Sequence, residues 1–302
     1  MTVEEHEDKV IVSLDSDPST SVTILKYGAT VVSWKLRGKE QLWVSSAAKL
    51  DGSKPVRGGI PLVFPNFGKT KDESHATAAL PQHGFARNST WEFLGQTTQS
   101  PLTVQFALSP DEANSDIYKL WGDGTNDFTL IYSIGLSDTL HTQIEVENTG
   151  KQAFDFHWLF HTYFKVEDIE DIIVNNLTEE KCYDQLLQSW YTEKAPMVNF
   201  NEEFDRIYKD IPEEKVLQII DKGYVLQNLR RSGLPDAVVW NPWIKKSEGM
   251  ADFEPKSGYL NMLCVECGNV TDFVKLEPGK AWTGSQTFQV GGEILVQSNI
   301  FA

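Results

Sequence analysis

Two histidines, His157 and His161, stand four residues apart in the aromatic segment FDFHWLFHTYF, residues 154–164. The segment contains no glycine or proline and predicts a strand, in which both imidazoles lie on one face, although a helix would also bring them together. Imidazole titrates near neutral pH and suits proton transfer. The spacing also resembles an H-x-x-x-H zinc motif, but Trp158 replaces the glutamate that a zinc protease needs. Alternatively, each histidine is a half-buried structural side chain.

A carboxylate ends an apolar stripe in the segment YLNMLCVECG, residues 259–268. Alternation along a strand places Leu260, Met262, Cys264 and Glu266 on one face. Desolvation there raises a carboxyl pKa toward the range useful to a general base, unless the glutamate points into solvent at the strand end. Cys264 and Cys267 form a C-x-x-C motif. A redox pair of this type should open a helix, and a structural zinc site needs a second pair that the chain lacks.

Two arginines lie in turn-rich segments bordered by aromatic residues, Arg57 in RGGIP and Arg87 in QHGFAR. Rigid loops of this kind can hold a planar guanidinium at a fixed point, and two of them could bind a phosphate. Alternatively, each arginine caps backbone carbonyls or pairs with one of the 43 acidic residues. Trp240 and Trp243 could stack on the apolar face of a sugar, although most tryptophans are core residues.

Strands are the elements that must position these side chains. Period-two alternation and runs of β-branched and aromatic residues predict strands along the whole chain, separated by Gly, Pro, Asn and Asp. The predicted strand segments are residues 10–14, 21–36, 41–44, 102–106, 128–136, 141–147, 153–166, 171–174, 238–240, 259–265 and 282–290.

Helix signals are few. Ser109-Pro110-Asp111-Glu112 offers an N-cap, a proline at the first helical position and a capping-box glutamate, which predicts a short helix that ends by Gly122. A second helical stretch is predicted between Glu179 and Trp190, where Leu186 and Leu187 stand among polar residues. Many antiparallel strands with few helices predict an all-β fold of two large packed sheets, with a concave, loop-rimmed face for a ligand.

Composition limits the function classes. The chain has 302 residues, 40% hydrophobic and 23% charged, without a linker or repeat, so we expect one globular domain. A net charge of −16 without a basic run argues against a nucleic-acid partner, and an anionic ligand would need local arginines. The acidic N-terminus does not resemble a secretion signal, no segment is apolar for long enough to span a membrane, and three cysteines suit a reducing cytoplasm.

Five motifs together resemble the hexose-6-phosphate mutarotases, the glucose-6-phosphate 1-epimerase branch of the aldose 1-epimerase superfamily. They occur in the family's order and span residues 57–270, so chance is a poor explanation. The motifs are RGGIP (57–61), HGFAR (83–87), HTYF (161–164), WNPW (240–243) and VECGNV (265–270).

The resemblance implies a galactose-mutarotase-like β-supersandwich, one domain over residues 1–302, and an isomerase that interconverts the α and β anomers of glucose 6-phosphate and related hexose 6-phosphates. It implies no metal and no cofactor, a small-molecule hexose 6-phosphate as the partner, and a cytoplasmic monomer. The implied site residues are His161 as general acid, Glu266 as general base, Arg57 and Arg87 as phosphate ligands, and Gln82 and Asp205 in contact with the sugar.

Two departures from the family pattern and three rival functions stay open. Asn66 stands where the family often has tryptophan, which could change the pocket wall and the preferred hexose. Residues 175–217 match no family motif apart from the short segment around Asp205. The rivals are a non-catalytic carbohydrate- or sugar-phosphate-binding β-sandwich, a mutarotase of unphosphorylated aldoses, and a glycoside hydrolase that uses the carboxylates of Glu266 and Asp205.

Overall fold

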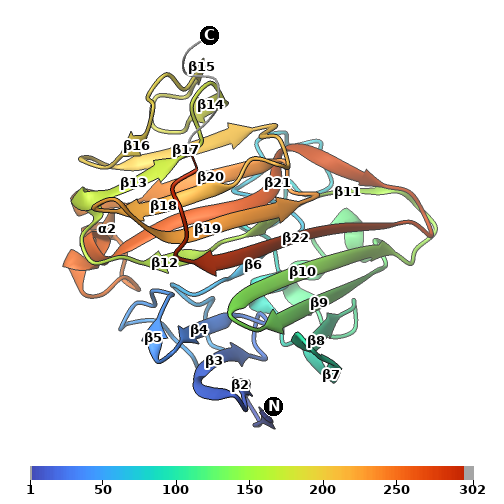
Figure 1. Cartoon of the computed structure of the whole chain (residues 1–302). Coiled ribbons are helices and arrows are strands. Elements are labelled where there is room, and N and C mark those ends of the chain that lie inside the picture. Colours follow the sequence, from blue (N-terminus) through green and yellow to red (C-terminus); the bar gives the residue numbers. More distant parts are fainter. Residues whose placement is uncertain (1, 296–302) are drawn as a thin grey trace.

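A computed structural model describes residues 2–295, whose strands form three antiparallel sheets (Figure 1). This confirms the predicted all-β class. The ends of the expected domain, residue 1 and residues 296–302, lie outside the described part of the chain. Within residues 2–295, no helix combines the length and apolar character that crossing a membrane requires.

The N-terminal sheet is a five-stranded meander, drawn in blue at one end of Figure 1. Its third and fourth strands come from the single predicted run 21–36, which is interrupted by Gly28 and Ala29, both at positive φ (70° and 43°). The strands are β1 (Thr2–Glu5), β2 (Lys9–Leu14), β3 (Asp17–Leu25), β4 (Val31–Leu36) and β5 (Lys39–Glu40).

The largest sheet has nine strands within the described residues. Its central strands alternate buried and half-buried side chains, as the period-two pattern of the sequence predicts. In spatial order the strands are β16 (Val198–Asn199), β13 (Ile172–Asn175), β18 (Leu217–Asp221), β19 (Tyr224–Ser232), β22 (Ala281–Val290), β10 (Thr139–Asn148), β9 (Phe128–Leu136), β8 (Leu102–Leu108) and β7 (Glu92–Gln99).

The third sheet has eight strands in the described part of the chain, with β12 (Tyr163–Lys165) paired beside β21. Predicted strand residues 259–261 instead form a 3-10 turn, and the strand begins at Met262. The remaining strands, in spatial order, are β15 (Ser189–Thr192), β14 (Lys181–Asp184), β17 (Phe204–Lys209), β20 (Asp236–Asn241), β21 (Met262–Leu276), β11 (Phe154–Phe160) and β6 (Leu62–Val63).

Residues 41–44 do not form the predicted strand, because Leu42 and Val44 make only isolated bridges. The carboxylate of Glu40 accepts hydrogen bonds from the backbone N–H groups of Gln41 and Leu42. The N–H of Gln41 also donates to the backbone carbonyl of Trp34 in β4, so Glu40 shares this donor with a neighbouring strand and, in addition, accepts the N–H of Leu42.

Both helix predictions need correction. Glu112 does bond back to Ser109, but this closes a turn, and α1 (Ser115–Tyr118) begins later with Asn114 as its N-cap. The stretch from Glu179 to Trp190 is a hairpin of β14 and β15, because Asp184 accepts the N–H groups at the tip and thereby stabilises a turn. The other helices are α2 (Trp243–Gly249) and the 3-10 turns η1 (Ala86–Asn88), η2 (Gly122–Gly124), η3 (Ile169–Asp171) and η4 (Lys256–Asn261).

The two large sheets pack face to face through aromatic side chains. Tyr132 of β9 lies against Phe160 of β11, and Trp282 of β22 lies against Phe156, with ring centroids 6.0 and 5.4 Å apart. Burying several large rings in one layer gives this core most of its stabilisation. Because strand residues alternate between faces, the neighbours of the core residues in β11, β20 and β21 point to the opposite side of the eight-stranded sheet.

Candidate active site

A cavity of about 360 Å³ lies on the face of the eight-stranded sheet that points away from the core. Its floor comes from the sheet, and its walls come from the loop between β5 and β7, the β14–β15 hairpin and α2. Its lining residues are Arg57, Phe67, Gly68, Gln82, His83, His161, Gln185, Asp205, Val238, Trp240, Lys246, Met250 and Glu266.

Strand register brings four of the side chains in and around this cavity into one row. Tyr163 of β12 stands opposite Cys264 of β21, which stands opposite Trp240 of β20, which stands opposite Asp205 of β17. Directly opposite residues in antiparallel strands share a face, so the row is a consequence of pairing rather than of sequence proximity. Glu266 follows two residues after Cys264 and therefore points to the same side.

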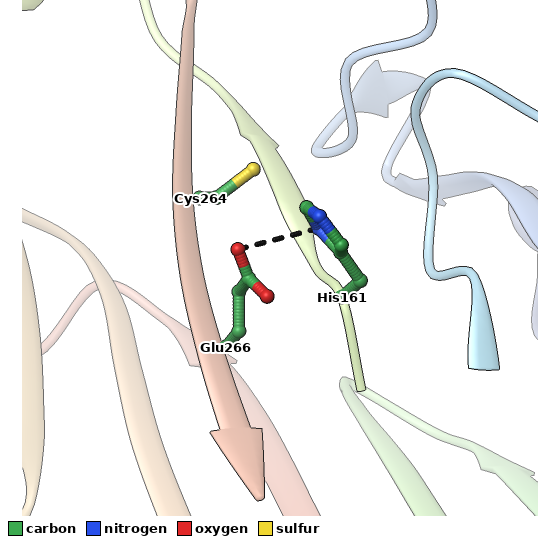
Figure 2. A group of neighbouring side chains, drawn as sticks. All are labelled: His161, Cys264 and Glu266. Atoms are coloured by element: carbon green, nitrogen blue, oxygen red, sulfur yellow. Dashed lines mark ion pairs between the residues drawn. The ribbon is translucent and has the colours of Figure 1, made fainter. Parts of the chain in front are cut away.

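His161 and Glu266 meet on the cavity floor, although 105 positions separate them in sequence. Nδ1 of His161 lies 3.3 Å from Oε1 of Glu266. Figure 2 shows Glu266 projecting from its strand toward the imidazole, with Cys264 beside it. His161 occupies the break between β11 and β12, where its backbone N–H donates to the carbonyl of Pro61. Both side chains are buried, with exposed fractions of 11% for His161 and 2% for Glu266.

Burial favours the neutral forms of both groups in the ligand-free cavity. Desolvation raises the pKa of Glu266 well above its ordinary value, with a further contribution from the charge of Asp205. Desolvation also lowers the pKa of His161 well below its ordinary value, and the positive charges of Arg57 and Arg87 add to this effect. These opposite shifts favour a proton on the carboxyl group of Glu266 over a proton on the imidazole of His161 when no ligand is bound.

Arg57 is held rigidly at the cavity wall. Asp252 accepts hydrogen bonds from Nε and Nη2 of Arg57 at 3.3 Å, and Nη1 donates to the hydroxyl of Tyr163 at 3.2 Å. The interactions with Tyr163 and Asp252 raise the pKa of Arg57. The ring of Tyr163 also stacks on His161, with centroids 4.7 Å apart, so one tyrosine contacts both the arginine and the imidazole. This arrangement leaves a fixed positive charge beside His161 and Glu266.

Arg87 lies behind the wall rather than in the cavity lining. Its Nη2 donates to the backbone carbonyl of Gln82 at 2.8 Å, while its buried Nε has no protein partner. Burial lowers the pKa of Arg87 to about 10, and the charge of Arg57 contributes to this shift. The two arginines are thus close enough to repel each other, and an anion between them would relieve that repulsion.

The two residues predicted to touch sugar, Gln82 and Asp205, both line the cavity. Asp205 accepts a hydrogen bond from Gln185 at 2.5 Å and pairs with Lys246 at 3.4 Å. Desolvation raises the pKa of Asp205 in spite of Lys246. The segment 175–217, which matched no family motif, therefore supplies Gln185 as well as Asp205.

Several lining residues were not singled out from the sequence. His83 stands within the HGFAR motif, and its positive φ of 68° marks a constrained turn that the following glycine could have indicated. Nothing in the local pattern points to Lys246, Gln185 or Phe67, because loops and a short helix bring them to the cavity. Asn66 does not line the cavity: its amide donates to the carbonyls of Gly68 and Pro81 and so ties the wall loop together.

The two motifs considered for zinc or redox chemistry do not assemble as such. His157 packs its ring on Phe273 at 3.7 Å and accepts the N–H of Phe67, outside the cavity lining. Cys264 and Cys267 are both buried free thiols, but Cys267 belongs to the main core and Cys264 to the smaller cluster beside Tyr163. Since they point to opposite faces of β21, they cannot form a C-x-x-C site.

Proteins with a similar sequence or architecture are named as candidate epimerases and mutarotases. A candidate glucose-6-phosphate 1-epimerase of Cenchrus ciliaris is 36% identical over 275 residues, which cover 86% of this chain and 78% of that protein. The crystal structure of a candidate mutarotase from Salmonella typhimurium has a TM-score of 0.80 and 25% identity, covering 96% of this chain and 92% of that one.

The fold extends to more distant proteins. A galactose mutarotase related enzyme from Lactobacillus acidophilus has a TM-score of 0.69 at 15% identity, over 100% of this chain and 99% of that one. The expected galactose-mutarotase-like fold is thereby confirmed. Residues 10–289 match the family model of aldose 1-epimerase. Since that match spans nearly the whole chain, the protein belongs to the aldose 1-epimerase family.

Proposed function

We propose that the protein interconverts the α and β anomers of glucose 6-phosphate and related hexose 6-phosphates. The observation that carries this proposal is the contact between His161 and Glu266 in a cavity whose wall also holds Arg57. An acid/base pair serves ring opening, and a fixed guanidinium serves a phosphate. The name of the relative from Cenchrus ciliaris supports the same reaction and substrate class, and the name of the Salmonella typhimurium structure supports the same reaction.

Anomer exchange requires two proton transfers at neighbouring atoms. Glu266 takes the proton of the C1 hydroxyl while His161 gives a proton to the ring oxygen, so that the bond between C1 and the ring oxygen breaks and an aldehyde forms. Rotation about the bond between C1 and C2 then presents the other face of the carbonyl. Closure reverses both transfers: Glu266 gives its proton to the oxygen at C1, and His161 takes back the proton from the former ring oxygen. The two oxygens share one carbon, which suits two groups whose atoms are 3.3 Å apart.

The phosphate helps to prepare the pair for this reaction. Arg57 and Arg87 depress the pKa of His161 in the free protein. A dianion bound beside them offsets their charge, raises the pKa of His161 and favours the form with imidazolium and carboxylate. The total number of protons on the pair does not change, since one proton moves from Glu266 to His161. Binding energy from the distal phosphate also orients C1 on the cavity floor.

Measured anomer exchange tests the proposal directly. Exchange NMR should show faster interconversion for glucose, galactose or mannose 6-phosphate in the presence of the protein, after subtraction of the spontaneous rate. We expect phosphorylated sugars to exchange faster than the free sugars at equal concentration. A carbohydrate-binding module would bind without acceleration. A glycoside hydrolase would release reducing sugar from an aryl glycoside, and we expect no such release.

Replacing Arg57 by Ala should weaken the binding of hexose 6-phosphate and reduce the protein's preference for hexose 6-phosphate over free glucose. A hydrogen bond to a charged group contributes about 1.5–3 kcal/mol, or about 10- to 100-fold in KM. Arg87→Ala should act in the same direction. The control is Arg230→Ala, since Arg230 is exposed on β19 outside the cavity lining. Equal KM values for the parent and the Arg57 variant would place the phosphate elsewhere.

Activity should show a bell-shaped dependence on pH. The pair is active when it carries one proton in total. Activity therefore falls at low pH, where both His161 and Glu266 are protonated, and at high pH, where neither is protonated. Because the pKa of His161 is lowered from 6.5 and that of Glu266 raised from 4.5, the acid limb lies below pH 6.5 and the basic limb above pH 4.5. The measurement is kcat/KM for glucose, which lacks the phosphate ionisation near about pH 6. A loss of activity on the acid side with its midpoint above pH 6.5 would contradict the lowered pKa of His161.

We also propose that the chain acts as one domain. One continuous hydrophobic cluster contains Val22 of the N-terminal sheet, Phe106 of the nine-stranded sheet and Val265 of the eight-stranded sheet, which supports this view. Three buried free thiols fit a reducing compartment such as the cytoplasm. The monomeric state stays a prediction, which sedimentation can test.

A further inference from the structure

The acid/base pair has a third neighbour that the proposed reaction does not use. Ligand atoms of His161, Cys264 and Glu266 all lie within 4.8 Å of one another, and all three residues are buried. Figure 2 shows the thiol of Cys264 on the same strand as Glu266, with both side chains directed toward the imidazole. Within residues 2–295, these three are the His, Cys, Asp and Glu side chains that stand close enough together to hold a metal ion.

Two atoms of the cluster make no hydrogen bond inside the protein, although one of them, Nδ1 of His161, lies 3.3 Å from Oε1 of Glu266. Nδ1 of His161 and Oε2 of Glu266 are buried and make no hydrogen bond, although His161 and Glu266 line the cavity. Buried polar atoms normally make hydrogen bonds. A metal ion could bind here to a polar atom that makes none and to the neighbouring thiol. An ion bound between Nδ1 of His161 and a carboxylate oxygen of Glu266 would displace no hydrogen bond of the protein.

The donor set selects a particular class of ion. Imidazole nitrogen, thiolate sulfur and carboxylate oxygen are the ligands of zinc, whereas magnesium and calcium prefer oxygen alone. Bond lengths to zinc place tetrahedral ligand atoms about 3.3–3.6 Å apart. The His161–Glu266 separation of 3.3 Å already meets this requirement. The widest separation in the cluster, at most 4.8 Å, would need to contract by about 1 Å, a small side-chain adjustment.

Charge balance also favours a divalent ion at this position. When zinc binds, the thiol of Cys264 and the carboxyl of Glu266 release their protons to solvent, and the two anions neutralise the ion. A neutral complex is far cheaper to bury than an isolated charge. Three protein ligands leave the fourth position of a tetrahedral ion open toward the cavity, where water can occupy it.

We infer that His161, Cys264 and Glu266 form a binding site for Zn²⁺ and similar thiophilic divalent ions, and that the bound ion inhibits the enzyme. The ion would occupy the lone pairs through which His161 and Glu266 exchange protons, and it would lie where C1 of the sugar must sit. The site is therefore inhibitory rather than a cofactor site. The inhibition rests on the proposed function, whereas the ion binding does not.

Cobalt absorption tests the ligand set without any activity measurement. Co²⁺ added to the purified full chain should produce visible bands of a four-coordinate ion and a near-ultraviolet thiolate-to-cobalt band, and Zn²⁺ should displace both. Cys264→Ala and Cys264→Ser should lose the thiolate band. The matched control is Cys267→Ala, which removes a buried thiol of the same strand on its core face. Melting curves establish that each variant is folded. A thiolate band that persists in both Cys264 variants, or none in the parent, would overturn the site.

Zinc titration of anomer exchange tests the inhibition. Zn²⁺ should inhibit the parent in competition with glucose 6-phosphate, a chelator should restore the rate, and Mg²⁺ should have no effect. With each variant normalised to its own zinc-free rate, the half-inhibitory concentration should rise at least about tenfold in Cys264→Ala and stay unchanged in Cys267→Ala. Equal zinc sensitivity in the two variants would contradict the inference. If no exchange activity exists, the cobalt spectrum still decides the site, so the two proposals fail separately.

Discussion

Replacing Glu266 by Gln should lower kcat for anomer exchange of glucose 6-phosphate by about 10²- to 10⁴-fold, with a much smaller change in KM. The amide keeps the shape of the side chain but cannot accept the C1 proton. Because Glu266 is buried with a raised pKa, the neutral amide also costs little in folding stability. Exchange NMR at saturating substrate measures the effect after subtraction of the spontaneous rate.

A second buried glutamate provides the control for this variant. Glu193 is also buried, but it bonds to Arg206 and Tyr208, away from the cavity lining. Glu193→Gln should therefore retain kcat even if its melting temperature falls. A Glu266→Gln variant with nearly the parent kcat would remove the assignment of the general base, and the proton acceptor would have to be sought elsewhere in the cavity.

Replacing His161 by Ala should lower kcat by a similar factor of about 10²- to 10⁴-fold. The variant loses the proton donor for the ring oxygen and the ring that stacks on Tyr163. Loss of stacking could also let Tyr163 move and loosen Arg57, so some increase in KM is expected. Saturation kinetics separate the two effects, since the chemical loss persists at saturating substrate.

His157 provides a control from the same segment. It is a buried histidine four residues earlier, packed on Phe273 and outside the cavity lining. His157→Ala should reduce thermal stability through lost packing while kcat stays near the parent value. Equal losses of kcat in the two variants would indicate a general effect of disturbing this segment, and the role of His161 as the acid would then be wrong.

The two groups act on one reaction, so their effects should not add. Once Glu266 cannot take the C1 proton, little catalysed rate remains for the removal of His161 to reduce. The double variant should therefore be only slightly slower than the slower single variant. Independent, additive losses would indicate that the residues serve separate steps.

Most of the fold could be predicted from alternation along the chain. Residues 128–136 and 282–290 alternate so regularly that the predicted and observed strands nearly coincide. The strands β7, β17, β18 and the nine-residue β19 were not predicted at all. Another error arose where a side chain closed a turn: Asp184 caps the hairpin that was predicted as helical. Such competition between side chain and backbone has no periodicity and is therefore hard to read from sequence.

The candidate site could be predicted in its residue types but not in its geometry. Local pattern and family resemblance pointed to His161, Glu266, Gln82, Asp205 and Arg57, and the structure brings all five to one cavity. The row from Tyr163 to Asp205 exists only because four strands pair in one register, and no local pattern encodes that register. Lys246 and Gln185 reach the cavity from elements with no signal of their own.

The chain's alternation and composition sufficed to predict an all-β fold, because strand periodicity depends on residue type and on spacing within single strands. The expected epimerase activity and the expected roles of His161, Glu266 and Arg57 came instead from the resemblance of the motifs to a known family. The distance between His161 and Glu266, the bracing of Arg57 by Asp252, the position of Arg87 behind the wall and the thiol beside the pair were decided by packing. They depend on which distant strands and loops become neighbours, and burial then sets the pKa values on which the chemistry of the pair depends.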